Sequence, residues 1–187
     1  MASKNKHRRF FRSEDTERRV DPEHEDINKI QLTKIIDFLH DFYGIEKKFF
    51  DDYIFMKLGK DVWMTTKSAK NMLSVCKSGL TVNSIGVRVL RNAFEVPKPT
   101  TNFVIFLNEK ITKNFYEMNE KELDEYTHGY EIKMRYDNEF KNYLIMKHKN
   151  QTYGVGLISE GTIKSQVPKG RKLKNQLASI KEEVIDE

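Results

Sequence analysis

The stretch from Asn142 to Asn175 constrains the fold of this chain more than any other part of the sequence. It begins with two runs rich in β-branched and aromatic residues, Tyr143 to Lys147 and Thr152 to Ile158, which suit a half-buried sheet. The polar residues from His148 to Gln151 make a connection of the length that β-hairpins use. From Lys164 onward the stretch holds five basic residues and no acidic one. We therefore expect a compact sheet with a cationic edge, which suits a phosphate backbone.

Basic residues are concentrated near both ends of the predicted fold. The chain of 187 residues carries a formal net charge of only +5. Its first 20 residues nevertheless hold seven basic residues against three acidic ones, and its last seven hold four acidic residues against one lysine. Polyanions are the natural partners of such clusters, although a solvated lysine-rich surface would explain either cluster alone.

The sequence indicates a soluble cytoplasmic protein. A single cysteine, Cys76, cannot form an intramolecular disulfide and fits a reducing compartment. No apolar run approaches the roughly 20 residues of a membrane helix, and no apolar signal segment follows the charged N-terminus. We expect no membrane association.

Hydrophobic spacing predicts the elements of the first half. Residues 1–24 have almost no apolar periodicity and are expected to form a flexible basic arm, in which two phenylalanines could stack on bases or dock on the fold. A helix is predicted from Ile27 to Tyr43, ending at Gly44. It is followed by a hairpin (Tyr53–Leu58 and Val62–Thr65), a short helix after Thr66 that contains Cys76, and a strand from Leu80 to Leu90 interrupted by Gly86.

Capping residues place the elements of the second half. Thr100 or Thr101 can cap a helix that contains Phe103 to Ile111, and Asn119 with Glu122 has the spacing of a capping box. We therefore expect a helix from Glu120 to about His128 that stops at Gly129. The remaining expectations are a strand from Ile132 to Tyr136, a basic segment held extended by Pro168 and Gly170, and a weak helix over 177–185.

Several patterns that can carry chemistry have simpler structural interpretations. Gly154, Gly156 and Gly161 depart from the spacing of both dinucleotide and phosphate-loop motifs, so we expect them to bend a small barrel or to permit close approach of a neighbouring or RNA backbone. Cys76 lies among apolar residues, Asp51 and Asp52 lack a third partner, and the histidines lack ligand spacing. We expect no catalytic residues, no metal site and no cofactor.

The second half of the chain resembles a PUA domain, a small pseudo-barrel that binds RNA. The residues that carry the resemblance are Tyr126-Thr-His-Gly129, Tyr143-Leu-Ile-Met-Lys147, Tyr153-Gly-Val-Gly156, Gly161-Thr-Ile-Lys164-Ser165 and Pro168-Lys169-Gly170-Arg171. These segments are similar in sequence to the C-terminal region of the Nol/Nop/Fmu (Sun) RNA cytosine-5 methyltransferases and to related short archaeal ribosome-biogenesis proteins. The segments Val62–Thr66, Ser84–Val89 and Pro99–Thr101 are similar to the pre-PUA region of those proteins.

The resemblance implies an α+β fold with a small N-terminal α/β pre-PUA domain and a C-terminal PUA-like mixed β pseudo-barrel. We expect a basic flexible arm (1–24), a pre-PUA domain (25–112), a PUA-like RNA-binding domain (113–175) and an acidic tail (176–187). The chain lacks the S-adenosylmethionine domain and the proline-cysteine nucleophile of the methyltransferases, so their reaction does not carry over.

The resemblance also implies an RNA contact surface, which consists of the turn after the helix, the final barrel strand and the exit from that strand. Together with the basic run, it gives these expected RNA-binding residues: Gly129, Gly154, Gly156, Lys164, Ser165, Lys169, Arg171, Lys172 and Lys174.

The leading hypothesis is a non-catalytic protein that binds structured rRNA or tRNA in ribosome biogenesis or RNA modification. Its further partners would be ribosomal precursor particles or an RNA-modifying enzyme. The alternative is a protein-interaction adaptor that recruits an RNA methyltransferase or a ribosome-assembly factor. A third possibility, an unrecognised nucleic-acid hydrolase, lacks clustered histidines or paired carboxylates in the sequence.

Overall fold

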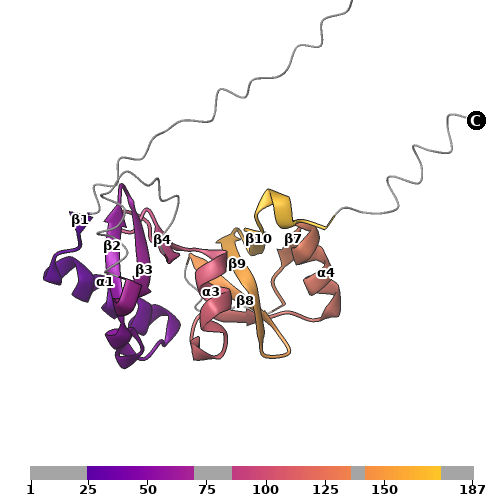
Figure 1. Cartoon of the computed structure of the whole chain (residues 1–187). Helices are drawn as coiled ribbons and strands as arrows, with labels where there is room; N and C mark the ends of the chain where they lie inside the picture. The colour runs from indigo at the N-terminus through magenta and orange to yellow at the C-terminus, as the bar shows by residue number, and fades with distance from the viewer. Residues whose placement is uncertain (1–24, 70–85, 136–141, 174–187) are drawn as a thin grey trace, which may run out of the picture.

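The computed structural model describes residues 25–69, 86–135 and 142–173, which form an α+β fold that includes a curled half-barrel sheet. Two five-stranded sheets lie side by side in Figure 1. The first has the order β1-β2-β3-β4-β5, with bounds Glu25–Asp26, Tyr53–Leu58, Asp61–Thr66, Val87–Arg91 and Lys98–Pro99. The second has the order β6-β8-β9-β10-β7, with bounds Phe115–Glu117, Tyr143–His148, Gln151–Ser159, Thr162–Ser165 and Glu131–Lys133. The α-helices of the described residues are α1 (Lys29–Tyr43), α3 (Thr101–Leu107) and α4 (Glu120–His128).

The predicted first helix and first hairpin are confirmed within two residues at each end. The side chain of Asn28 accepts a hydrogen bond from the backbone of Gln31 at the start of α1, and Gly44 ends the helix in the left-handed conformation, with φ of 68°. Strands β2 and β3 pair in antiparallel fashion in continuous register. The described part of the next predicted strand is β4, and Gly86 precedes it at φ of +78°.

Gly86 permits a close approach of two backbones, which is one of the two roles, with a bulge, that a glycine interrupting a strand suggests. A Cβ atom added to Gly86 would lie 2.1 Å from the carbonyl oxygen of Met64 on β3. A side chain at this position would therefore force β3 and β4 apart.

The second sheet contains the predicted hairpin and the predicted capped helix. Strands β8 and β9 are joined by Lys149 and Asn150, which have φ of 48° and 63°, so the turn has positive φ at both central residues. Asn119 and Glu122 form the complete capping box at the start of α4, and Gly129 ends that helix. Strand β6 pairs with β8 in parallel, whereas the other pairs of this sheet are antiparallel.

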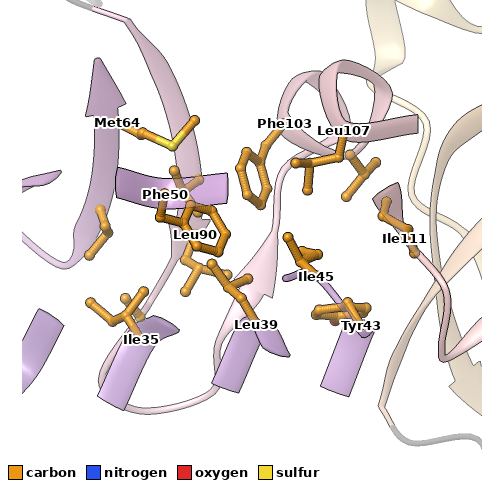
Figure 2. Packing of buried hydrophobic residues seen from close by; sticks show 14 of the residues in the cluster. Ile35, Leu39, Tyr43, Ile45, Phe50, Met64, Leu90, Phe103, Leu107 and Ile111 are labelled. Atoms are coloured by element: carbon orange, nitrogen blue, oxygen red, sulfur yellow. The ribbon is translucent and has the colours of Figure 1, made fainter. Parts of the chain in front are cut away.

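One large hydrophobic core joins the two sheets. It combines Leu39 and Tyr43 of α1 with Phe103 and Leu107 of α3, and it reaches Ile145 and Val155 in the second sheet. Figure 2 shows α1, the first sheet and α3 converging on this core. A smaller core, which includes Tyr116, Tyr126 and Ile163, lies within the second sheet and α4.

The strands up to Pro99 form the first sheet, and the strands from Phe115 onward form the second. The large core nevertheless includes residues on both sides of the predicted domain boundary at residue 112. The side-chain hydroxyl of Tyr43 also donates a 3.0 Å hydrogen bond to the carbonyl oxygen of Tyr143. The division into two domains stays a prediction.

The basic segment after Gly161 is extended in its first part, as predicted, but not after Pro168, where we expected Pro168 and Gly170 to hold it extended. Residues Thr162–Ser165 form strand β10, and Lys169–Arg171 form one turn of 3-10 helix, in which the backbone amide of Arg171 donates to the carbonyl of Pro168 at 2.8 Å. Proline fixes only its own φ, so it can precede a tight turn as well as an extended run.

Several predictions concern residues outside the described ranges. They are the basic arm (1–24), the helix containing Cys76, most of the interrupted strand before Gly86, Lys174, the weak helix over 177–185 and the acidic tail (176–187). Within the described ranges, none of the helices has the length and apolar character needed to cross a membrane.

Candidate nucleic-acid interface

The basic C-terminal segment returns to the end of α4 and contacts the glycine turn there. Gly129 has φ of +84°, and a Cβ atom added to it would lie 2.3 Å from Nζ of Lys172. The side chain of Lys172 therefore lies across Gly129. The backbone amide of Leu173 donates to the carbonyl of Thr127 at 3.1 Å, which holds the segment in place. A cation at a helix C-terminus is also favoured by the helix dipole.

Ser165 and Lys164 have different surroundings on β10. The hydroxyl of Ser165 donates to the carbonyl oxygen of Tyr126 at 2.9 Å, so it ties β10 to α4. Lys164 is exposed, and its Nζ lies 3.7 Å from a carboxylate oxygen of Glu131 on β7. An exposed pair of this kind is weak in water, so the Lys164 cation stays available to a polyanion.

The structure places Gly154 and Gly156 inside the fold, which differs from the expected RNA contact. A Cβ atom added to Gly154 would lie 2.4 Å from the hydroxyl of Tyr126, and one added to Gly156 would lie 2.4 Å from a methyl carbon of Ile163. Both glycines are buried. Their role is to let neighbouring side chains pack against β9, whereas the sequence led us to expect the approach of a neighbouring or RNA backbone. We leave them out of the candidate interface.

A cavity of about 580 Å³ opens between the two sheets, and Arg171 reaches it from the 3-10 turn. The segments that form it come from β3, β4, β5, the start of α3, β9 and the exit from β10. Within the described ranges, the lining includes four cationic side chains, one tryptophan and no carboxylate: Trp63, Gly86, Val87, Arg88, Arg91, Lys98, Pro99, Thr100, Thr101, Asn102, Val155, Gln166, Pro168 and Arg171.

Two of these cations are held in place by neighbouring groups. The guanidinium carbon of Arg88 lies 4.9 Å from the ring centre of Trp63, and a guanidinium nitrogen lies 3.3 Å from a carboxylate oxygen of Asp61. Lys98 donates a hydrogen bond to the side-chain oxygen of Gln166 and lies 5.4 Å from the ring centre of Tyr143. Binding an anion would therefore require little ordering of these two side chains.

The cavity brings several positive charges together in a partly buried environment, where burial and mutual repulsion make each charge less stable. Burial lowers the pKa of Lys98, and the positive charge of Arg91 lowers it further. Like charges in a partly buried site repel one another, so an anion that enters the cavity would relieve this repulsion.

Sequence reasoning missed the cavity residues on the first sheet, including Trp63, Arg88, Arg91 and Lys98. Regular alternation along a strand would place Arg88 and Arg91 on opposite faces, so their spacing in the sequence does not predict that both line one cavity. The register of β3 with β4 shifts between Val62 and Trp63. One signal was present: residues 62–94 hold five basic residues and no acidic one.

The acidic residues that the sequence singled out stay on a different surface. Asp51 and Asp52 line a second cavity of about 870 Å³ with Glu46, Glu109 and two lysines. Among the described residues, no group of three or more histidine, cysteine, aspartate or glutamate side chains is arranged to hold a metal ion. The positive and acidic cavities therefore differ in the partners that they suit.

Comparison with known proteins adds no relative to this description. A scan of the chain against models of protein families finds no match, and a search of curated protein sequences finds none either.

Proposed function

We propose that this protein binds RNA without catalysing a reaction, and that it acts in ribosome biogenesis or in rRNA or tRNA modification. The observation that carries the proposal is the cavity between the sheets, where cations from separate segments gather without a carboxylate from the part of the chain that the structure describes. The proposed RNA surface runs from this cavity along the 3-10 turn to the Lys172 side chain over Gly129. Phosphate oxygens of a nucleic acid match this distribution of charge.

The resemblance to PUA domains supports RNA rather than another polyanion. The mixed sheet around β8 and β9, with α4 ending at Gly129, agrees with the pseudo-barrel that the resemblance implies for residues 113–175. The segments that resemble the pre-PUA region contribute Trp63, Arg88 and Thr100 to the cavity. Both parts of the resemblance thus supply residues to one surface.

The salt dependence of binding gives a direct test. The surface offers six exposed or cavity-lining cations, Arg88, Arg91, Lys98, Lys169, Arg171 and Lys172. If each neutralises one phosphate, log K against log salt should have a slope of about −4 on single-stranded RNA.

The decisive variant replaces Lys169, Arg171 and Lys172 together by alanine. Binding to labelled total tRNA and to rRNA fragments should weaken, and the slope should become shallower by about 2. A matched control removes three lysines that pair with carboxylates elsewhere, Lys47, Lys48 and Lys60. The control changes the net charge equally and should leave the slope almost unchanged. If the first variant retains the affinity and slope of the wild type, the proposal fails.

A second candidate function is a protein-interaction adaptor that recruits an RNA methyltransferase or a ribosome-assembly factor. An apolar groove of about 330 Å³ between α1 and the loop after β4 favours it. Phe94 lines this groove and is 44% exposed, and neighbouring Val96 is 55% exposed. A partner recovered from nuclease-treated lysate by the wild type, and lost with Phe94→Glu, would support this function. An association that disappears on nuclease treatment would be bridged by RNA and would refute it.

A further inference from the structure

The cationic cavity combines three kinds of group that a single nucleotide requires. Trp63 provides an aromatic ring, Asn102 provides an amide with one acceptor and two donors, and four cations provide positive charge. The volume of about 580 Å³ lies within the range of roughly 300–1,000 Å³ that small-ligand sites occupy. A site for inorganic phosphate alone would need neither the ring nor this volume.

We propose that the cavity takes one unpaired nucleotide of the bound RNA, with its base against Trp63 and its phosphate among Arg88, Arg91, Lys98 and Arg171. The inference rests on the proposed function and adds the kind of RNA that the protein selects. RNA with a bulge, a loop or a free end would be preferred to a continuous duplex.

The shape of the site favours an unpaired nucleotide over a double helix. The walls of the cavity belong to both sheets, so its interior lies between them rather than on an outer face. A duplex carries its phosphates on a convex surface with its bases stacked inside, so the bases of a duplex cannot stack on Trp63. Unstacked bases of loops and bulges can turn outward and stack on aromatic side chains.

The Trp63 ring, on which the base would stack, is already held in place by its neighbours. Arg88 lies over the Trp63 ring and is held there by Asp61, so the cation and the ring keep a fixed relation before RNA arrives. Trp63 is partly buried on β3, which limits its freedom further. Stacking of the base on a ring that is already ordered therefore requires little further loss of side-chain freedom.

Trp63 is the only tryptophan of the chain, so its fluorescence reports directly on the cavity. The experiment compares three labelled, blunt-ended RNA hairpins of one stem sequence, in which a non-nucleotide linker replaces the loop: one is fully paired, one has a single-nucleotide bulge, and one has the same bulge lacking its base. We expect the bulged hairpin to change the tryptophan emission and to bind about 10-fold more tightly than the paired one. The hairpin that lacks the bulged base should bind like the paired one.

Two variants assign the effect to the cavity. Trp63→Leu and Arg91→Gln should each weaken binding to the bulged hairpin more than binding to the paired one, and so reduce the preference to about 3-fold or less. Arg91 is exposed, so its substitution tests the cavity even if Trp63→Leu fails to fold. An Arg91→Gln variant that folds and keeps the full preference would overturn the inference.

The remaining outcomes separate this inference from the proposed function. If paired and bulged hairpins bind equally, without a change in emission, and the Lys169, Arg171 and Lys172 triple variant still weakens both, the RNA-binding function stands and the nucleotide inference is overturned. If free uridine or adenosine monophosphate changes the emission and the hairpins do not, the cavity serves a free nucleotide and the RNA assignment is overturned. If no hairpin and no cellular RNA binds, the proposed function fails.

Discussion

Replacing Glu122 by alanine should destabilise the protein far more than an ordinary change on a helix surface. Glu122 is only 5% exposed and accepts three hydrogen bonds. The donors are the hydroxyl of Tyr116 at 2.8 Å, the backbone amide of Asn119 at 2.8 Å and the side chain of Arg135 at 2.7 Å. The carboxylate thus joins the start of α4 to β6 and to the segment after β7.

The expected cost follows from what each donor would lose. The hydroxyl of Tyr116 is fully buried, and a buried donor without an acceptor costs about 1–3 kcal/mol. Loss of half of the capping box at Asn119 adds about 1 kcal/mol. The side chain of Arg135 is 46% exposed and can turn to water, so its contribution is small. We expect Glu122→Ala to lower the free energy of unfolding by about 2–4 kcal/mol.

Thermal and urea unfolding monitored by circular dichroism would measure this difference. The melting temperature should fall by roughly 5–15 °C for a chain of this size. The matched control is Glu125→Ala on the same helix, whose carboxylate pairs with an exposed lysine at 3.7 Å and should contribute less than about 0.5 kcal/mol. Equal losses in the two variants would refute the role of the buried network.

The pH dependence of stability provides a second measurement on the same group. Burial alone would raise the pKa of Glu122, but hydrogen bonds from Arg135, Asn119 and Tyr116 outweigh it and hold the pKa below its ordinary value. A carboxylate with a lowered pKa contributes stability that is complete above its unfolded pKa of about 4.3. That contribution is lost as the pH falls through the folded pKa, so wild type should lose stability there more steeply than Glu122→Ala.

Three further predictions follow from close contacts and from the charge of the cavity. Gly44→Ala should lower the free energy of unfolding, measured in urea, by at least about 2 kcal/mol, because a Cβ atom would lie 2.1 Å from the hydroxyl of Thr112. Gly161 is also at positive φ, but no atom lies within 4 Å of an added Cβ, so Gly161→Ala should lower it by about 1 kcal/mol. Gly156→Ala should cost about 1–3 kcal/mol through overpacking between β8 and β10, and an unchanged unfolding midpoint would contradict this. Because burial and the neighbouring arginine lower the pKa of Lys98, RNA affinity in alkaline buffer should decline at a lower pH for wild type than for Lys98→Arg, as measured by fluorescence anisotropy.

Elements that are determined by local signals could be predicted from the sequence. Asn119, Glu122 and Gly129 define α4 through backbone capping within one helix, and Gly44 ends α1 in the same way. The turn at Glu160 and Gly161 is harder to recognise, because glutamate seldom adopts its φ of 49°. Residue patterns ended the preceding strand at Ile158, and only the resemblance implied a further strand, which the structure has at Thr162–Ser165.

The cavity depends on contacts between distant segments, and it was beyond sequence reasoning for that reason. Arg88 and Arg171 line one cavity although most of the folded chain separates them in sequence. Their proximity depends on how the two sheets pack against each other, which no local sequence pattern specifies. Eight of the nine RNA-binding residues that the sequence predicted lie within the described ranges, and of these eight only Arg171 lines the cavity, while Lys172 packs on Gly129.

The core that joins the two sheets has a consequence for how the protein unfolds. Ile145 and Val155 pack in the same cluster as Leu39, and the hydroxyl of Tyr43 bonds to the backbone of Tyr143. Opening either sheet would expose apolar surface of the other, so the two should melt in one cooperative transition with equal calorimetric and van't Hoff enthalpies. The cavity walls would then form and disappear together with the whole fold, and neither half of the chain would present the assembled surface by itself.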